Sequence, residues 1–369
     1  MRLAAGGSTR YPLSMDWTAD SGNLVVRADN LVALRQLASG FARRFALAYL
    51  DPPYNTGTRK AEAYDDAMSR AAWRQFMGER LSALWPLMAP TGVVMVQIDD
   101  RELGTVLSLI EEQDRRVLNH VVVKMSELSG VKMAHAQHRL PKIKEHLIIV
   151  AAGPQATLRN VRTPKPMDKL IAYSRYYSQV LMNPQDPIER WRLEPVREVA
   201  AQAWGWDPQA GDAHRRLAEL KLEHAERMVY RTNNALIARD AGQGIRRLRS
   251  PDGVKYVAWD DKQMLFLADH VDQPLGDLWT DVSTINLNKE GGVAFRHSKK
   301  PEKLMRRCLE LASEPGDWVL DPFAGSGTTA AVAWQTGRQF VTIEQGEHAK
   351  TAVCRRLDAL GAPYRFIEP

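Results

Sequence analysis

A strand that ends in two prolines is encoded by Phe45-Ala46-Leu47-Ala48-Tyr49-Leu50-Asp51-Pro52-Pro53-Tyr54-Asn55-Thr56-Gly57. The first six residues form a continuous apolar run, which predicts a strand buried on both faces of a sheet. The prolines end the strand because they lack the backbone N–H that a ladder requires. We therefore expect an acid, a rigid turn and an aromatic ring at the carboxyl end of a strand, where open α/β sheets bind ligands.

The group Asp51-Pro52-Pro53-Tyr54 suits a planar ligand with an exocyclic amino group. The Asp51 carboxylate and the carbonyls of Asp51 and Pro52 can accept hydrogen bonds, and Tyr54 offers a flat face for stacking. A nucleobase has both features. The alternative is an ordinary strand-to-loop turn with an Asp cap, which the longer motif and its apolar strand make the weaker interpretation.

A second motif lies far along the chain, in Trp318-Val319-Leu320-Asp321-Pro322-Phe323-Ala324-Gly325-Ser326-Gly327-Thr328-Thr329. Glycines between a strand and a helix allow the backbone to approach a ligand closely. The motif opens with Asp-Pro-Phe rather than carrying the GxGxxG of a dinucleotide site, and it ends in Thr-Thr rather than the Lys-Ser/Thr of a Walker A loop. Glu344 ends the next predicted strand, where an acid can accept both hydroxyls of a ribose. A surface glutamate is the alternative there.

Together the two motifs resemble those of the DNA amino-methyltransferases, which modify adenine N6 or cytosine N4. The catalytic motif precedes the cofactor motif, as in the β group of that family. Asn55-Thr56-Gly57 extends the similarity to its branch of type III modification subunits and solitary relatives. Recognisable motifs cover roughly residues 20–150 and 279–350. Asp at position 51 resembles the adenine-specific form, and cytosine N4 remains the alternative.

The resemblance implies an α/β fold: a Rossmann-like methyltransferase sheet, mostly parallel and seven-stranded, with a circularly permuted motif order and an inserted target-recognition domain. It implies a catalytic half at residues 1–151, the target-recognition domain at 152–278 and a cofactor-binding half at 279–369. The implied cofactor is S-adenosylmethionine. The implied catalytic residues are Asp51, Pro52, Pro53 and Tyr54, and the implied cofactor-binding residues are Asp29, Asn30, Lys300, Asp321, Phe323, Gly325, Ser326, Gly327, Thr328, Glu344 and Gln345.

Two of these residues have simple structural alternatives. Asp29 precedes a predicted helix that begins at Leu31, so it can be the N-cap of that helix. Lys300 precedes a helix with Pro301 at its first turn. It can therefore be a solvent-exposed lysine rather than a residue beside the methionine end of the cofactor.

Residues 152–278 change in character, with many prolines and with aromatic residues interleaved with arginines. A solvated face over a small core would account for this composition. The resemblance favours DNA recognition, because the family places its target-recognition region between the two motifs. The candidate DNA contacts are Arg246, Arg247 and Arg249 in a predicted basic hairpin, and Lys132, His138 and Arg139 in a basic loop beside the catalytic motif.

Composition narrows the class of protein. The chain has 369 residues, 44% of them hydrophobic and 25% charged, as in globular proteins. A formal charge of +6 and a pI near 9.2 favour a polyanionic partner. Cys308 and Cys354 lack zinc-site spacing, and His135 and His138 lack a third ligand, so we expect no metal. The absence of a signal-peptide core and of a long apolar run predicts a cytoplasmic protein.

The function implied is methyl transfer from S-adenosylmethionine to N6 of an adenine flipped out of double-stranded DNA. The alternatives are cytosine N4 methylation and a DNA-binding modification subunit that acts with a separate restriction partner. Methylation of a protein glutamine would show Asn in place of Asp51. The resemblance also allows a homodimer. No helicase or nuclease motif occurs, so we expect any cleavage to come from the partner.

Overall fold

The computed structural model describes residues 17–56, 68–126, 140–235, 246–249, 255–259, 262–282, 287–292 and 299–368. The chain divides into two compact units. The larger unit comprises Met1–Asn160 and Gly276–Pro369, and the smaller unit is the intervening Val161–Leu275.

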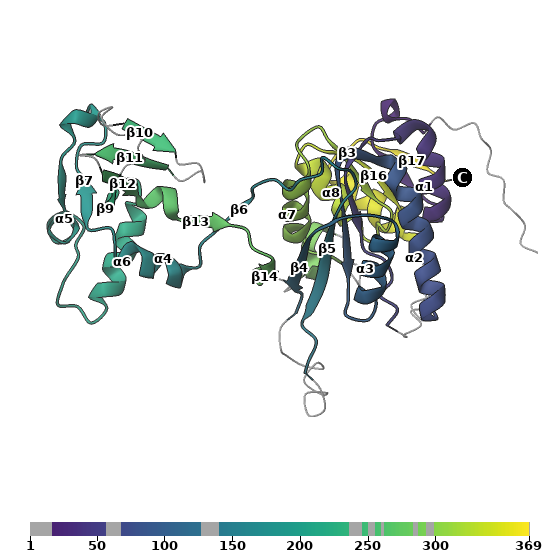
Figure 1. Ribbon diagram of the computed structural model, residues 1–369, viewed down its shortest axis with the longest axis horizontal. Helices are drawn as coiled ribbons and strands as arrows, with labels where there is room; N and C mark the ends of the chain where they lie inside the picture. Colours follow the sequence, from purple (N-terminus) through teal and green to yellow (C-terminus); the bar gives the residue numbers. More distant parts are fainter. Residues whose placement is uncertain are drawn as a thin grey trace, which may run out of the picture. The chain divides into compact units, whose positions relative to one another are not determined.

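The described part of the larger unit forms a nine-stranded sheet in the order β14-β4-β5-β3-β2-β15-β16-β1-β17 (Figure 1). Strand β5 is antiparallel to β3 and β4, and the other neighbouring strands are parallel. The strands are β1 (Leu24–Val26), β2 (Phe45–Leu50), β3 (Met88–Ile98), β4 (Val117–Lys124), β5 (Lys144–Ala151), β14 (Leu278–Trp279), β15 (Trp318–Asp321), β16 (Gln339–Ile343) and β17 (Arg365–Ile367).

The expected α/β class and the mostly parallel sheet are confirmed, but the described sheet has nine strands rather than seven. The two strands at its edges, β14 and β17, are only two and three residues long. Strands this short leave no apolar run or alternation that a sequence pattern can detect. The count of seven was therefore wrong at the edges.

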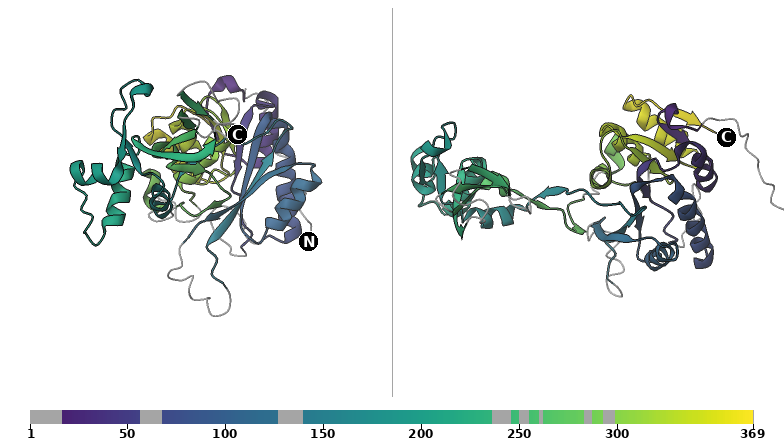
Figure 2. Two further views of the ribbon diagram at one scale, coloured as in Figure 1. Left: turned by 60° about the vertical axis from the view of Figure 1, so that its left-hand side comes forward. Right: turned by 45° about the horizontal axis from the view of Figure 1, so that its top comes forward.

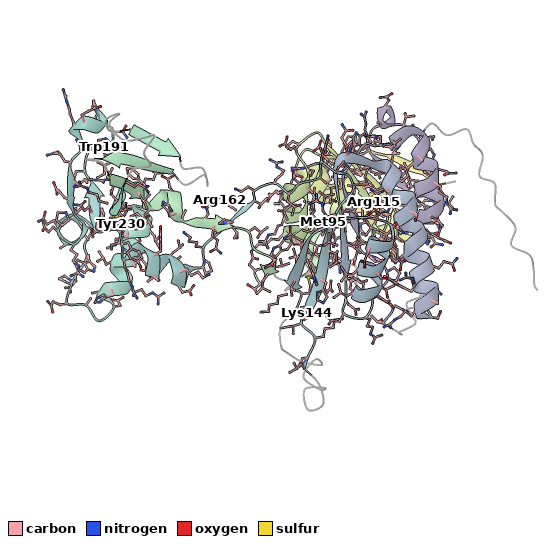
Figure 3. All side chains as sticks on the ribbon, viewed as in Figure 1. Met95, Arg115, Lys144, Arg162, Trp191 and Tyr230 are labelled. Carbon is pink, nitrogen blue, oxygen red and sulfur yellow. The ribbon has the colours of Figure 1, made fainter. Side chains whose placement is uncertain are left out.

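Helices cover both faces of this sheet. Helices α1 (Asn30–Phe41), α2 (Arg70–Leu84) and α3 (Leu103–Glu112) lie along one side, and α7 (Glu302–Ala312) and α8 (Thr328–Gln335) lie along the other (Figures 1 and 2). The central strands are consequently buried on both faces, as Met95 in β3 illustrates (Figure 3). This two-sided burial is the reason that β2, β3 and β5 are continuous apolar runs in the sequence.

Helix α2 ends earlier than its apolar periodicity predicts. The pattern extends to Met88, whereas the α-helix ends at Leu84, a 3₁₀ turn covers Trp85–Leu87, and β3 begins at Met88. Pro86 lies in the first turn of the 3₁₀ segment. Proline lacks the N–H that would continue the α-helical ladder, so the helix stops before it.

Aromatic rings pack together at the amino ends of β2 and β15. Phe45 and Trp318 begin these strands and are register partners. Phe41 stacks on Phe45 with ring centroids 5.4 Å apart and meets Trp318 edge-on at 5.1 Å. Such pairs contribute about 0.5–1.5 kcal/mol each beyond their burial. The register shifts by one residue directly after this pair, so that Leu47 lies opposite Val319, and the two strands then run in parallel towards the two sequence motifs.

The smaller unit has its own antiparallel sheet and core. Its described strands follow the order β10-β11-β12-β9-β7-β8, and the ends of the unit pair as β6 with β13. The strands are β6 (Arg162–Pro164), β7 (Gln179–Leu181), β8 (Leu193–Pro195), β9 (Met228–Ala235), β10 (Arg246–Arg249), β11 (Lys255–Trp259), β12 (Lys262–Phe266) and β13 (Asp272–Pro274), and the helices are α4 (Met167–Ser174), α5 (Val196–Ala203) and α6 (Ala213–Glu223).

Most of the aromatic residues of the smaller unit pack inward. Tyr177 is fully buried, and Trp204 stacks on His224 with ring centroids 4.1 Å apart. Trp191 packs against Phe266 within the same unit, where Figure 3 labels it. The aromatic part of the pattern is thus largely a small core, which is the structural alternative raised by the sequence. Tyr176, at 58% exposure, is an exception.

Candidate active site

The two sequence motifs meet at one edge of the large sheet. Strands β2 and β15 are parallel neighbours, with Leu47 opposite Val319 and Ala48 opposite Leu320. Asp51 follows β2 directly and Asp321 is the last residue of β15. Because parallel strands end at the same edge, the Asp-Pro-Pro-Tyr turn and the glycine-rich turn lie side by side, at the edge where α/β sheets bind ligands.

Neighbouring helices hold the Asp-Pro-Pro-Tyr turn in place. The indole N–H of Trp73 in α2 donates to the carbonyl of Pro53 at 2.7 Å. Asn55 has a left-handed backbone, with φ of 55°, and its side-chain amide donates to Glu102 at 2.8 Å. Arg101 donates to the carbonyl of Asn55 at 3.1 Å. The turn is therefore fixed from two helices rather than left as a free loop.

One buried ammonium group joins the catalytic motif to a second carboxylate. Lys300 Nζ lies 3.1 Å from Asp51 Oδ1 and 3.0 Å from Glu145 Oε2. It also donates to the Tyr54 hydroxyl at 2.7 Å, and that hydroxyl in turn donates to Glu145 at 2.8 Å. The side chains of Lys300 and Asp51 are only 8% and 15% exposed. We call Asp51, Tyr54, Glu145 and Lys300 the carboxylate–lysine cluster.

The two carboxylates of the cluster differ in proton affinity. Burial raises the pKa of Asp51 above its usual value, although the Lys300 charge opposes the increase. Burial also acts to raise the pKa of Glu145, but the Lys300 charge and hydrogen bonds from Tyr54, Lys300 and Gln97 outweigh it and lower that pKa. The pKa of Lys300 is raised, because attraction to the two carboxylates exceeds the opposing effect of burial. Lys300 and Glu145 are therefore both charged near neutral pH.

Sequence reasoning missed Glu145 and the residues behind it. The Gln97 amide donates to Glu145, and its carbonyl accepts from the Tyr49 hydroxyl. Gln97 is fully buried and is the one polar residue in the apolar run Val93–Ile98, which was the available signal. Glu145 gave no such signal. It reaches the site because β5 is antiparallel to β3, so its beginning lies beside the carboxyl end of β3.

Lys300 lies just before α7, as the sequence predicts, with Pro301 as the N-cap. The structure brings its ammonium group to Asp51 and Tyr54. With an exposure of 7%, it is not the solvent-exposed lysine of the alternative interpretation.

The glycine-rich turn links β15 to α8. Gly325 and Gly327 have φ of 51° and 72°, in the left-handed region that L side chains rarely adopt. A Cβ added to Gly327 would lie 3.1 Å from Val353 Cα. The Asp321 carboxylate accepts from the N–H of Phe323 at 2.9 Å, and burial raises the pKa of Asp321 to about 7.

The hydroxyls of the same turn are buried. Ser326 and Thr328 lie 3.1 Å apart, and Arg356 donates to the Thr328 hydroxyl at 2.9 Å. Arg356 also pairs with Glu302, at the beginning of α7. These contacts fix the first turn of α8. The backbone of the glycines is then the part of the motif that a ligand can approach most closely.

Glu344 follows β16 and is buried beside the glycine-rich turn. Its two oxygens accept one N–H each, from Gly325 at 2.9 Å and from Gly346 at 3.0 Å. Burial raises its pKa, partly offset by these hydrogen bonds. A carboxylate offers about four acceptor positions, so the oxygens retain capacity for a pair of hydroxyls. Gln345, the next residue, is exposed.

Asp29 is an N-cap, as the structural alternative predicts, and it also belongs to a network that reaches the glycine-rich turn. Its carboxylate accepts from the N–H of Val32 at 3.1 Å and pairs with Arg80 at 3.0 Å. Arg80 also donates to Asn30, whose amide donates to the carbonyl of Pro322 at 2.9 Å. Helix α2 therefore supports the loops after β1, β2 and β15 together.

The candidate DNA contacts belong to two segments of the chain. Arg246, Arg247 and Arg249 form β10 in the smaller unit, where they pair with β11. Lys132, His138 and Arg139 lie outside the described residues.

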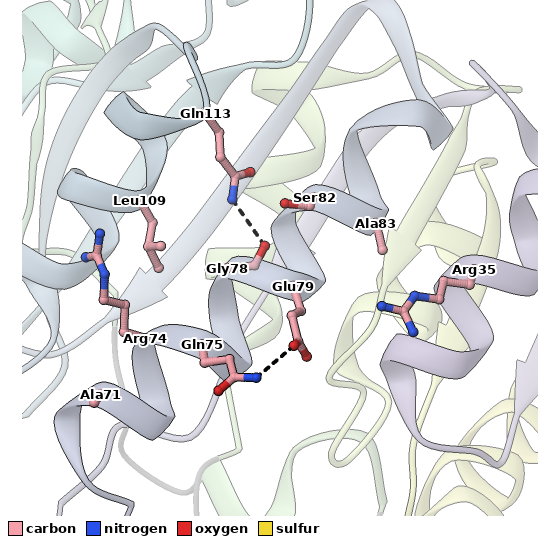
Figure 4. Close-up of a pocket in the computed structure, with 10 residues that line it drawn as sticks. All are labelled: Arg35, Ala71, Arg74, Gln75, Gly78, Glu79, Ser82, Ala83, Leu109 and Gln113. Atoms are coloured by element: carbon pink, nitrogen blue, oxygen red, sulfur yellow. Dashed lines mark hydrogen bonds between the residues drawn. The ribbon is translucent and has the colours of Figure 1, made fainter. Parts of the chain in front are cut away.

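A separate open hollow of about 680 Å³ lies among the helices α1, α2 and α3, which cover one face of the large sheet (Figure 4). Residues of α1, α2 and α3 line it, and Gln113 and Gln75 form hydrogen bonds across its wall to Gly78 and Glu79. It contains none of the candidate catalytic or cofactor-binding residues. None of the helices in the described part of the chain has the length and apolar character that a bilayer crossing requires.

The chain belongs to the N6/N4 DNA methylase family, whose profile, described as a DNA methylase, matches residues 45–354. It is 29% identical to a probable type III restriction-modification enzyme HindVI Mod subunit from Haemophilus influenzae, over 91% of this chain and 50% of that protein. It is 25% identical to the StyLTI Mod subunit, also of a type III enzyme, from Salmonella typhimurium, over 84% of this chain and 49% of that protein. The chain thus spans about half the length of these curated relatives.

Among solved structures, the chain is similar to a putative DNA modification methylase from Thermus thermophilus complexed with S-adenosyl-L-methionine. The identity is 15% and the TM-score is 0.47, and the match covers 94% of this chain and 99% of that chain.

Proposed function

We propose that this protein is a site-specific DNA methyltransferase that methylates N6 of an adenine flipped out of double-stranded DNA, with S-adenosylmethionine as the methyl donor. One observation carries the proposal: the Asp51 turn and the glycine-rich turn end neighbouring parallel strands. Membership in the N6/N4 DNA methylase family supports it. In this proposal the large sheet is a Rossmann-like methyltransferase fold with a permuted motif order.

The glycine-rich turn suits S-adenosylmethionine. Gly327 lacks the Cβ that would crowd Val353, and Glu344 can accept a pair of ribose hydroxyls. Phe323 and the glycines would hold the ligand, with Asp29 and Gln345 at its border. When bound, the cofactor would supply an electrophilic methyl group whose bond to sulfur breaks with the electron pair remaining on sulfur.

Asp51 and the carbonyl of Pro52 would activate the amino group of the base. The lone pair of that nitrogen is delocalised into the ring, so the group is a poor nucleophile. Two acceptors on its N–H bonds draw the nitrogen towards tetrahedral geometry, and its lone pair forms the new N–C bond. Positive charge then grows on nitrogen, and an anionic Asp51 stabilises it more in the transition state than before. One N–H proton finally passes to the Asp51 carboxylate.

The reaction requires a base outside the duplex. Tyr54 offers a half-buried ring for that base to stack on, worth on the order of 1–3 kcal/mol against the cost of unstacking. Hydrogen bonds of its hydroxyl with Lys300 and Glu145 hold the ring in one orientation. A preset stacking face reduces the ordering that binding must otherwise impose.

The smaller unit would read the DNA sequence. It carries the basic strand β10, and it lies in the sequence between the two motifs. Replacing Arg246 and Arg247 together by Ala should weaken DNA binding. It should also make the slope of log K against log salt concentration shallower, by about one for each phosphate that is no longer neutralised. Cofactor affinity should not change. Unaltered DNA binding would count against this assignment.

The similarity to Mod subunits favours a second, compatible role. The protein would act as the modification subunit beside a separate restriction subunit, and it would form a homodimer. Co-purification of a tagged chain with the product of a neighbouring gene tests the first point, and light scattering tests the second.

One experiment tests the chemistry. The purified protein is incubated with unmethylated genomic DNA and S-adenosylmethionine labelled in its methyl group, and the DNA is digested to nucleosides for mass spectrometry. Labelled N6-methyladenine is the expected product. Labelled N4-methylcytosine would move the function to the cytosine class, and label on neither base, with intact cofactor binding, would contradict the proposal. The Asp51→Ala variant serves as the inactive control.

A further inference from the structure

The carboxylate–lysine cluster carries an unequal number of opposite charges. Asp51 and Glu145 can each carry a negative charge, and Lys300 carries the single positive charge between them. All three groups lie at the same edge of the sheet, yet they come from three segments: the end of β2, the beginning of β5 and the residue before Pro301. With both acids ionised, the cluster has one net negative charge.

Glu145 competes with Asp51 for the ammonium group of Lys300. The Lys300 distances to the two carboxylates are nearly equal, at 3.1 and 3.0 Å, but Glu145 also accepts hydrogen bonds from Tyr54 and Gln97. Without Glu145, the ammonium would pair with Asp51 alone. That pair would be neutral, and the Asp51 oxygens would be less available to a substrate amine.

We propose that Glu145 is a positioning residue that shares the Lys300 ammonium with Asp51, so that the cluster keeps one net negative charge facing the amine that becomes positive during methyl transfer. The inference rests on the proposed function. Lys300 is equally required, because without its positive charge the two carboxylates would repel each other and one would take up a proton. The net charge of the whole cluster, rather than the charge of any one residue, stabilises the amine during methyl transfer.

This charge balance predicts opposite pH shifts for two single variants. Asp51 must be ionised to accept the proton of the amine, so its ionisation sets the acid limb of the activity profile. Glu145→Gln removes a like charge, so the acid limb moves to lower pH. Lys300→Met removes the opposite charge, so the limb moves to higher pH. Tyr54, and Asp321 on the neighbouring strand, also face Asp51 and remain in both variants.

The test compares Glu145→Gln, Lys300→Met and the double variant with wild type, using labelled S-adenosylmethionine and unmethylated DNA. Glu145→Gln should lower kcat on the order of 100-fold while KM for DNA changes by less than about threefold. The double variant restores one net negative charge, so its kcat should exceed that of Glu145→Gln. Glu112→Gln, the same substitution at an exposed ion pair with Arg74, is the control for the change itself.

Two outcomes would overturn the inference. One is a Glu145→Gln variant with wild-type kcat and an unshifted acid limb. The other is a double variant whose loss equals the product of the two single losses, which indicates independent structural roles.

A readout without catalysis separates this inference from the proposed function. Urea unfolding of wild type, of Asp51→Asn, of Glu145→Gln and of the variant that combines Asp51→Asn with Glu145→Gln gives the coupling between the two acids. We expect a repulsive coupling at pH 8 that weakens by pH 4, and additivity at both pH values would contradict the arrangement. If wild type transfers no methyl group but this coupling is present, the proposed function is wrong, whereas the sharing of Lys300 between Asp51 and Glu145 still holds.

Discussion

The indole N–H of Trp73 donates a 2.7 Å hydrogen bond to the carbonyl of Pro53, and helix α2 thereby holds the turn that presents Asp51. Trp73 is fully buried, so this hydrogen bond is shielded from water. The same helix supports the loop after β1 through Arg80. One helix thus fixes the relative positions of the backbone segments around the candidate active site.

Replacing Trp73 by Phe should loosen this turn while keeping an aromatic ring in the core. The Pro53 carbonyl loses its donor, which costs about 1–3 kcal/mol of unfolding free energy, and kcat should fall because Asp51 is less well fixed. Urea unfolding and the methyl-transfer assay measure the two effects. Trp85→Phe is the matched control, since it removes an indole hydrogen bond to Gln113 instead. Equal losses of kcat in both variants would contradict a specific role for Trp73.

Gly327→Ala should weaken cofactor binding as well as stability. The residue has φ of 72°, and its Cβ would press on Val353 at the glycine-rich turn. We expect a loss of about 1–2 kcal/mol of unfolding free energy, measured by urea unfolding, and a lower S-adenosylmethionine affinity by calorimetry. Gly361→Ala, with a φ of 62° and open space around it, tests the cost of a left-handed backbone without this crowding. Cofactor affinity that falls equally in both variants would contradict the prediction.

Glu344→Gln should lower cofactor affinity by about 10- to 100-fold. The amide replaces an acceptor oxygen by a donor, which then faces the N–H of Gly325 or Gly346 and no longer accepts a ribose hydroxyl. Calorimetric titration with S-adenosylmethionine measures the change. Glu347→Gln, an exposed glutamate in the same loop, should bind normally. If Glu344→Gln retained full affinity, the ribose role would be wrong.

Asp321→Asn should stabilise the protein at high pH. The folded state raises the pKa of Asp321 from 3.8 to about 7, chiefly by burial, so folding favours the protonated acid. The contribution of Asp321 to the free energy of unfolding therefore falls as the pH rises from about 4 to about 7, by on the order of 2–4 kcal/mol. The variant lacks this loss, so its advantage should be largest at pH 8 and absent near pH 4. Urea unfolding across this range measures it.

Asp281→Asn should change the stability at high pH in the opposite direction. Hydrogen bonds from Arg307 at 2.7 and 2.9 Å keep the pKa of Asp281 well below its usual value. The contribution of Asp281 is present at neutral pH and disappears in acid, so Asp281→Asn should destabilise the protein at pH 8. An increase in stability at pH 8 for Asp281→Asn, or a decrease for Asp321→Asn, would contradict the assigned causes.

The central sheet could be predicted because strands that are buried on both faces consist of unbroken apolar runs. Phe45–Leu50 and Trp318–Leu320 are such runs, and each is followed by a turn motif with its own chemistry. The short strands of the smaller unit left no comparable pattern. There the amphipathic, charged pattern of residues 214–230 predicts a single helix, but α6 ends at Glu223 and Tyr230 lies on β9. Packing within that unit, rather than periodicity, decides where its elements end.

The candidate site could be predicted only as far as motifs extend. Asp51 and the glycine-rich turn belong to recognisable patterns, whereas Glu145 enters through the antiparallel pairing of β5 with β3. The helical spacing of Trp73 and Arg80 places both on one face of an amphipathic helix, with Trp73 predicted to lie in the core, and both are buried. Their polar atoms support the loops around the site, and no spacing rule predicts which carbonyl or carboxylate such an atom will reach.

The smaller unit begins and ends at the same place. Strand β6 pairs with β13, and beyond them the N–H of Leu275 donates to the carbonyl of Val161 at 3.0 Å. An insertion whose entrance and exit touch can be lengthened, shortened or replaced without stretching the sheet that it interrupts. In the proposed function, exchanging this unit would therefore change the DNA sequence that is recognised and leave the strands that precede Asp51 and the glycine-rich turn in place.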